Sequence, residues 1–277
     1  MQRMNRIVLG LLLLVFIIFI TVPTNASETA ESIAESTSFF INNLNLISGN
    51  EEIPYLLKTE WDQAGKYAMY TPAKVRVGCW STAIAQILCY HKLFPKGIVG
   101  YKCTEGYQIN ENLESYGFDW NQFVNKIDDT TPQTSIDQIA KYSYFVAVVI
   151  RKDFGTGSYL MNDLTYKNVL EKHFRCIATE YYFKNYLFNK KKTKIIKLIK
   201  SEINASRPIM FYFTDWKNVT HAVVIDGYSE KNDLFLVHIN QGLGGGGNGN
   251  YNLFDSISQL GNDMKFRFLL TIKPRSY

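Results

Sequence analysis

A chain of 277 residues, of which 46% are hydrophobic and 14% aromatic, is long and apolar enough to bury a substantial core, as one large domain or two small ones. Its formal net charge of +5 is too mild to indicate a nucleic-acid-binding protein. No Cys-x-x-Cys or His-x-x-x-His spacing occurs, so a zinc site is not expected.

The first 26 residues predict a secretory signal peptide. Arg3 and Arg6 precede an almost wholly apolar run of sixteen residues, 7–22, and Thr24-Asn25-Ala26 puts small residues at the −3 and −1 positions of a cleavage site. Sixteen apolar residues are short for a membrane span, and an uncleaved anchor is the alternative. We therefore expect a secreted or periplasmic mature protein without stable membrane insertion. Loss of two arginines would lower its net charge from +5 to +3.

The segment around Cys79 predicts a nucleophile. Gly78 stands directly before the cysteine, and the apolar residues that follow have the spacing that buries one face of a helix. These residues are Ala83, Ile84, Ile87 and Leu88. A thiol in the first turn of such a helix lies at the positive end of the macrodipole and beside unpaired N–H groups, and both favour the nucleophilic thiolate. A small buried cysteine without a chemical role is the alternative.

His221 is the predicted partner of this cysteine. It opens a run of β-branched residues that is closed by Asp226-Gly227, a pattern typical of a buried strand that ends in a tight turn. An imidazole at the edge of a strand, facing a thiol at the start of a helix, is the Cys–His arrangement of nucleophilic catalysis. The remaining histidines are expected to be structural.

Three blocks of the chain together resemble the streptopain family of papain-clan cysteine peptidases. They are Gly78-Cys79-x-x-Thr82-Ala83-x-Ala85-Gln86-Ile87 with Tyr90-His91, then His221-Ala222-x-Val224-Ile225-Asp226-Gly227, and His238-Ile239-Asn240-x-Gly242-x-Gly244-Gly245. The resemblance covers roughly residues 51–255. It implies an α+β, papain-like fold, with a helical part that bears Cys79, an antiparallel sheet that bears His221, and the active-site cleft between them.

The resemblance also suggests residues that would contact the substrate. The family has a Trp-x-Gln like Trp61-Asp62-Gln63 upstream of its nucleophile, and a side-chain amide there can donate to the oxyanion beside the Cys79 N–H. A solvated loop glutamine is the alternative for Gln63. A Gly-Ser loop borders the family's substrate cleft, which makes Ser158 and Tyr159 candidate wall residues unless their loop is a plain connector. Thr220, next to His221, is a further candidate.

The third catalytic position departs from the family pattern. Gln241 and Leu243 stand where the family has two tryptophans. An imidazolium needs an acceptor on its second ring nitrogen to keep its orientation. We expect the side-chain amide of Asn240 to supply it, with Gln241 as the alternative.

The rest of the chain gives a coarse pattern of elements and thiols. Helices are predicted over residues 163–174 and 190–203 and strands over 209–213, 234–239 and 265–272, whereas residues 136–149 begin as a helix and drift into a β-like run. Residues 101–123 show no period and predict loops. If Cys79 stays free, Cys89, Cys103 and Cys176 allow at most one disulfide.

The sequence thus predicts a secreted thiol endopeptidase with a signal peptide (1–26), a short N-terminal extension or remnant propeptide (27–50) and a peptidase domain (51–277). His221 would take the proton of Cys79, and the thiolate would form a thioester with a protein or peptide substrate, with no metal or organic cofactor. A papain-clan leader peptidase, a cell-wall amidase, or a catalytically impaired binding protein that kept the fold are the alternatives.

Overall fold

The structure, a computed structural model, describes residues 55–162, 164–184, 190–214, 220–231, 234–254 and 266–276. The chain divides into two units, Met1–Asn43 and Leu44–Tyr277, and every described residue belongs to the second. The predicted signal peptide and N-terminal extension therefore lie outside the described residues. Within the described ranges, none of the helices has the length and hydropathy needed to cross a membrane.

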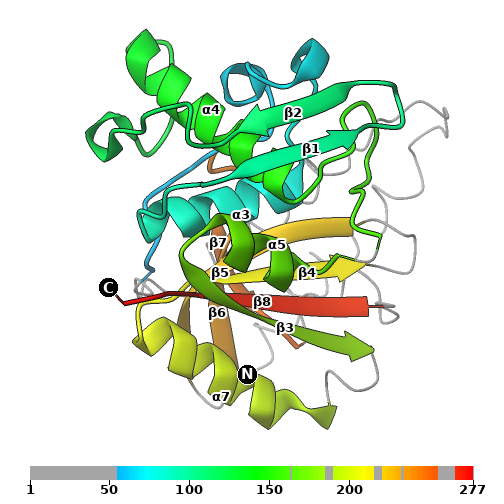
Figure 1. Ribbon diagram of the computed structural model, residues 1–277. Coiled ribbons are helices and arrows are strands. Elements are labelled where there is room, and N and C mark those ends of the chain that lie inside the picture. Colours follow the sequence, from blue (N-terminus) through cyan, green and yellow to red (C-terminus); the bar gives the residue numbers. More distant parts are fainter. Residues whose placement is uncertain are drawn as a thin grey trace, which may run out of the picture. The chain divides into compact units, whose positions relative to one another are not determined.

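An antiparallel sheet of six strands forms one part of the described unit, in the order β3-β8-β4-β5-β6-β7 (Figure 1). Its strands are β3 (Cys176–Lys184), β4 (Ile209–Thr214), β5 (Thr220–Lys231), β6 (Leu234–Asn240), β7 (Gly249–Asn252) and β8 (Phe266–Pro274). The three strands predicted by range are confirmed, as is the strand that opens near His221. Val224 pairs with Asn240, so His221 and the residues that follow Asn240 lie at the same end of β5 and β6.

The helical part contains α3 (Cys79–Tyr90) and α4 (Gln133–Val149), with a two-stranded hairpin of β1 (Ile98–Lys102) and β2 (Gln108–Asn112). Short 3-10 turns, Gly65–Ala68, Pro72–Lys74 and Trp120–Gln122, complete it. The hairpin lies partly in the segment for which the sequence predicted only loops. The helix predicted to begin at Cys79 is confirmed, and it packs against α4 on one side and against β4 and β5 on the other.

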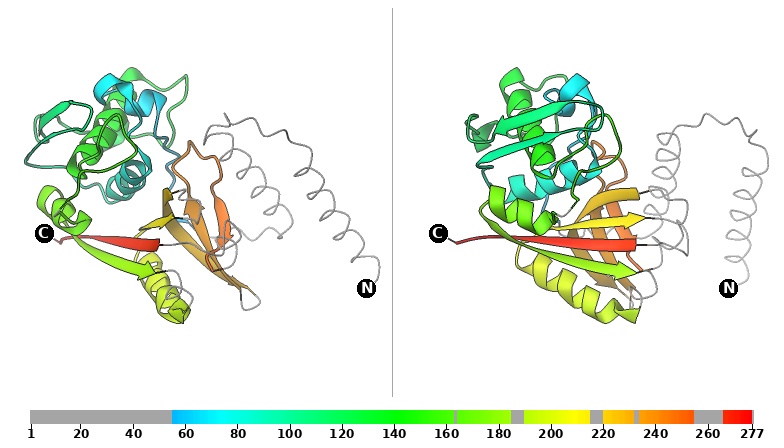
Figure 2. Two further views of the ribbon diagram at one scale, coloured as in Figure 1. Left: turned by 90° about the vertical axis from the view of Figure 1, so that its right-hand side faces the viewer. Right: turned by 45° about the vertical axis from the view of Figure 1, so that its right-hand side comes forward.

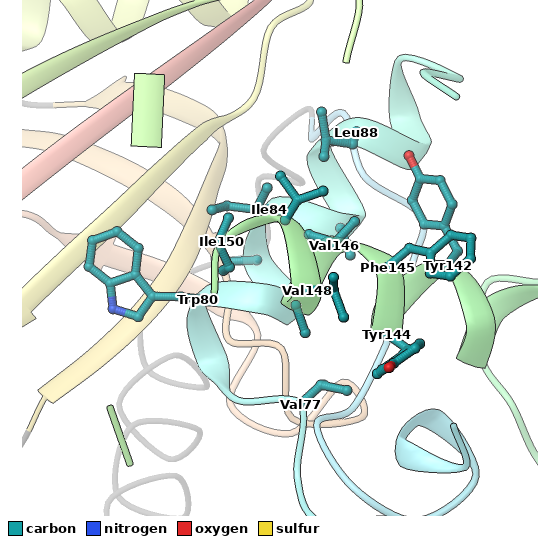
Figure 3. Packing of buried hydrophobic residues seen from close by; sticks show 14 of the residues in the cluster. Val77, Trp80, Ile84, Leu88, Tyr142, Tyr144, Phe145, Val146, Val148 and Ile150 are labelled. Carbon is teal, nitrogen blue, oxygen red and sulfur yellow. The ribbon is translucent and has the colours of Figure 1, made fainter. Parts of the chain in front are cut away.

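The prediction that residues 136–149 drift into a strand is wrong, because α4 is helical throughout. Figure 3 shows Val146 and Val148 of α4 beside Ile84 of α3, and all three side chains are fully buried. Valine costs only a few tenths of a kcal/mol in a helix relative to better helix formers. Complete burial of a valine side chain stabilises by about 1.5–3 kcal/mol. Packing therefore decides the conformation of this segment.

The sheet is covered on both faces. Successive side chains of a strand point to opposite faces, and Met210, Ala222 and Val224 join the core under α3, whereas Phe211 and Val223 are buried outside that cluster. The second face packs against α7 (Lys192–Asn204), whose buried stripe is Ile195, Ile199 and Ile203. Figure 2 shows α7 and α3 on opposite sides of the sheet. The predicted basic amphipathic helix thus uses its apolar stripe for the core.

One helix, α5 (Tyr166–His173), packs against β3. It falls within the predicted range 163–174 and begins with Thr165 as its N-cap, whose side chain accepts a hydrogen bond from Asn168 N. Trp80 of α3 stacks on Tyr166 of this helix with ring centroids 4.3 Å apart, and Figure 3 shows its indole pointing away from α4. The start of α3 is therefore fixed by aromatic packing on the side away from α4.

Candidate active site

Cys79 is the first residue of α3, and its position follows from the conformation of Gly78. Gly78 has φ +88°, a left-handed region that favours glycine, and its carbonyl accepts the first helical hydrogen bond, from Thr82 N at 3.0 Å. A Cβ at position 78 would lie 2.6 Å from the Tyr159 hydroxyl and 3.3 Å from Lys152 Cε. Only glycine fits here, both for its backbone angle and for the space.

The structure places Cys79 beside the start of β5, the strand that bears His221. The Cys79 thiol lies beside the main-chain N–H of Ala222, the residue after His221 in β5, and this N–H lowers the pKa of the thiol. Both Cys79 and His221 are half-buried. The start of a helix and the start of a strand, far apart in sequence, thus meet where the Cys–His arrangement was predicted.

The His221 ring has a defined tautomer. Nε2 lies 3.1 Å from the main-chain carbonyl oxygen of Gln241. A carbonyl only accepts hydrogen bonds, so Nε2 carries the proton and Nδ1 of the neutral ring is the acceptor. Burial lowers the pKa of His221 to about 4, and the bond to Gln241 acts in the opposite direction. The imidazole is therefore neutral at pH 7, with the free lone pair on Nδ1.

The electrostatic balance at the thiol differs from the expectation. Burial raises the pKa of Cys79, against the lowering expected from its place at the helix start. The N–H groups of Ala222, Trp80 and Cys79 itself lower it, and so does the positive charge of Lys152. The N-terminal donors of the helix thus act as predicted, but burial outweighs them in the free protein.

The amide of Asn240 does not contact the His221 ring, which corrects the prediction. Asn240 Oδ1 accepts a hydrogen bond from Gly242 N at 3.0 Å, and its Nδ2 donates to a main-chain carbonyl at 2.6 Å. Gln241 turns its side chain to the Tyr251 hydroxyl, 3.2 Å away. The acceptor is instead the Gln241 carbonyl, because the Asn240–Gly242 turn points that main-chain oxygen at the ring.

Gln86 is a buried junction that the sequence did not identify as functional. This residue of α3 is fully buried, and its Nε2 donates to Asn240 Oδ1 at 3.2 Å. Its Oε1 accepts from the Thr59 hydroxyl at 2.8 Å and from Trp61 N at 3.4 Å. Asn240 Nδ2 also donates to the Thr59 carbonyl. The helix, the end of β6 and the segment before Gln63 are therefore joined through one side chain.

Gln63, the predicted oxyanion donor, lies close to the nucleophile and is buried. Its main-chain carbonyl accepts a hydrogen bond from Val77 N at 2.9 Å, two residues before Cys79. Its Nε2 donates to the Gly242 carbonyl across a long 3.4 Å. A solvated loop glutamine, the alternative interpretation, does not fit a residue that is only 8% exposed.

The predicted substrate contacts differ in their positions. The Tyr159 hydroxyl lies against Gly78, directly before the nucleophile. Ser158 is exposed, and its hydroxyl donates to Asp153 Oδ2 at 3.2 Å. Thr220 is an exposed residue at the first position of β5. Of these three residues, Tyr159 contacts the segment that bears the nucleophile. The substrate contacts of Tyr159, Ser158 and Thr220 stay predictions.

The four cysteines, all in the described part of the chain, are free thiols. Among the described residues, no group of three or more His, Cys, Asp or Glu side chains could hold a metal ion.

Comparisons with known proteins find a matching family and similar solved structures. The model of the Peptidase C10 family matches residues 61–251. The structure of active wild-type interpain A cysteine protease from Prevotella intermedia aligns with a TM-score of 0.61 at 20% identity, over 79% of this chain and 93% of that one. A prointerpain A fragment from the same organism, a cysteine-to-alanine mutant, aligns with a TM-score of 0.62 at 18% identity, over 90% and 86%. No curated protein sequence matches. The predicted resemblance and the α+β, papain-like fold class are confirmed.

Proposed function

The chain belongs to the peptidase C10 family and is a cysteine-type peptidase, and we propose that it is an endopeptidase that cleaves protein or peptide substrates through Cys79 and His221. The observation that carries this proposal is the His221 ring, whose Nε2 is held by the Gln241 carbonyl while the Cys79 thiol lies beside the next residue of the same strand. A thiol and an oriented, neutral imidazole are the two groups that acyl transfer needs.

The first step is transfer of the thiol proton to His221 Nδ1. The resulting imidazolium keeps its bond from Nε2 to the Gln241 carbonyl, which is stronger once the ring is charged. The thiolate attacks the scissile carbonyl and forms a tetrahedral adduct. The Cys79 N–H and Gln63 Nε2 would donate to its oxyanion, and one such donor contributes about 2.7–4 kcal/mol. The long bond of Gln63 to Gly242 is easily exchanged for one to an oxyanion.

The second half of the cycle returns the proton. The imidazolium gives it to the leaving amine, and the substrate's acyl group stays on Cys79 as a thioester. Water, deprotonated by the neutral His221, then attacks the thioester and releases the acid and the free thiol. No cofactor is needed for either half.

Export completes the proposal. The apolar run 7–22 and the Thr24-Asn25-Ala26 pattern support a protein that acts outside the cytoplasm. N-terminal sequencing of the secreted protein should return Ser27, whereas Met1 would show an uncleaved anchor.

The nucleophile is tested by Cys79→Ser with Cys89→Ser as the matched control, since both cysteines lie on α3 and are partly exposed. We expect Cys79→Ser to abolish casein hydrolysis and labelling by an epoxide thiol inhibitor with an unchanged circular dichroism spectrum, and Cys89→Ser to retain both. The opposite pattern would overturn the assignment. Hydrolysis of peptidoglycan but not casein by the wild type would favour the amidase alternative.

A further inference from the structure

A buried lysine lies beside Gly78, the residue before the nucleophile. Lys152 follows the end of α4 and is only 4% exposed. Its Nζ donates to the carbonyl oxygens of Asp153 at 3.2 Å, of Ser158 at 3.3 Å, and of Thr156. An ammonium group has three protons, so these carbonyls satisfy all of them. The loop 153–158 thus holds a positive charge in the interior by main-chain dipoles.

The carboxylate of Asp153 acts on this charge without pairing with it directly. Asp153 is adjacent and almost fully buried, but its oxygens accept from Thr104 N and Oγ1, each at 2.8 Å, and from the hydroxyls of Thr156 at 3.1 Å and Ser158 at 3.2 Å. Burial raises the pKa of Asp153, and these donors more than offset it, so that the pKa is lowered. Within the described ranges, no carboxylate lies within 4.0 Å of Lys152 Nζ, the limit for a salt bridge.

The side chain of Lys152 points along the start of α3. Its Cε lies 3.3 Å and its Cδ 3.6 Å from where a Cβ of Gly78 would be. Its Nζ is 5.2 Å from the centre of the Tyr159 ring, whose hydroxyl also lies against Gly78. The last methylenes of Lys152 therefore lie against the residue that precedes Cys79.

Among the described residues, Lys152 supplies the positive charge that acts on the thiol. Within the described part of the chain, the other titratable groups that interact with Cys79 are Tyr159 and Tyr166, and His221 directly precedes Ala222, whose N–H lies beside the thiol. Burial raises the pKa of both tyrosines and lowers that of His221, so all three are neutral at pH 7. Burial also lowers the pKa of Lys152, while the charges of Asp153, Cys79 and Cys103 raise it.

We propose that Lys152 is a positioning residue whose fixed positive charge favours the thiolate of Cys79, and that the loop 153–158 holds this charge in place. The proposal rests on the proposed function, in which that thiolate is the nucleophile. It gives a chemical reason for a buried charge, whose desolvation costs free energy even when its protons are hydrogen-bonded. The loop whose carbonyls bind the charge is also followed directly by Tyr159, the candidate wall residue of the predicted cleft.

The test measures the ionisation of Cys79 without relying on peptidase activity. In the full chain, the rate of Cys79 alkylation by iodoacetamide is followed from pH 5 to 10 by peptide mapping, which separates Cys79 from the other three thiols. Lys152→Gln removes the charge and keeps donors for the carbonyls, Lys152→Met removes both, and Lys152→Arg keeps the charge. Lys66→Met, an exposed lysine paired with Asp129, is the matched control for net charge.

We expect the midpoint of the alkylation profile to rise in Lys152→Gln and Lys152→Met, with slower alkylation below the midpoint, because the charge of Lys152 lowers the pKa of Cys79. Lys152→Arg should stay near the wild type, and Lys66→Met should not move it. A folded Lys152→Gln with an unchanged midpoint would overturn the proposal, as would an equal shift in Lys66→Met. If the wild type had no peptidase activity but the alkylation midpoint still rose in Lys152→Gln, the role of Lys152 would be supported and the endopeptidase function refuted.

Discussion

Replacement of Asn240 by alanine should lower kcat by roughly 10- to 150-fold with little change in KM. We expect Asn240 to act on His221 through the turn in which its Oδ1 accepts from Gly242 N and the Gln241 carbonyl lies at Nε2. A hydrogen bond to a charged group contributes about 1.5–3 kcal/mol, and the imidazolium exists only after proton transfer. Loss of that bond therefore raises the barrier without weakening substrate binding, and each 1.36 kcal/mol is about tenfold in rate.

The same substitution should also destabilise the fold. Asn240 is 3% exposed and makes three hydrogen bonds through its side chain, to Gly242, Gln86 and Thr59. At about 0.5–1.5 kcal/mol each, their loss lowers the free energy of unfolding by roughly 1.5–4.5 kcal/mol. Kinetics must accordingly be measured well below the melting temperature of the variant.

Gln241→Ala is the matched control, because it removes the bond to Tyr251 but leaves the carbonyl on His221. Its kcat should stay within about twofold of the wild type. Steady-state kinetics on a fluorogenic peptide, with thermal melting of each variant, separates the two effects. A larger loss of kcat in Gln241→Ala, or a destabilised Asn240→Ala with full kcat, would refute the main-chain mechanism.

Two further predictions concern the start of α3 and acid. Gly78→Ala should abolish activity and lower the melting temperature more than the control Gly65→Ala. Both glycines have positive φ, but a Cβ at Gly78 would lie 2.6 Å from a neighbouring atom, whereas nothing lies within 4 Å of one at Gly65. Equal losses of melting temperature in the two variants would contradict this prediction. Burial lowers the pKa of His221 and His91 to about 4, whereas in the unfolded chain these histidines take up protons near pH 6.5. Their contribution to the free energy of unfolding is therefore fully present above pH 6.5 and is lost as the pH falls towards 4. The denaturant midpoint should fall over that window, with a smaller fall in His91→Gln, and a constant midpoint would count against buried neutral histidines.

The sequence was sufficient for the parts of the site that have local signals. These signals come from residues that are neighbours in the chain. They are Gly78 before Cys79, the helical spacing of apolar residues after it, and His221 at the start of a β-branched run. The contacts of Gln86, Lys152 and the Gln241 carbonyl depend instead on strand register and on how α3 meets β5 and β6. A buried glutamine or lysine in a sequence looks like a surface residue until its partners are known.

The main-chain contact on His221 bears on the departure from the family pattern at position 241. If a side chain held the ring, replacing the tryptophan expected there would change the catalytic geometry. The acceptor is a carbonyl oxygen, which every residue at position 241 supplies. What the site requires is the turn from Asn240 to Gly242, and Gly242, at φ +66°, lies so near Thr82 of α3 that a Cβ would be 3.1 Å from its methyl group. The chain can therefore lack the tryptophan and still keep an oriented histidine, as long as Asn240 and Gly242 remain.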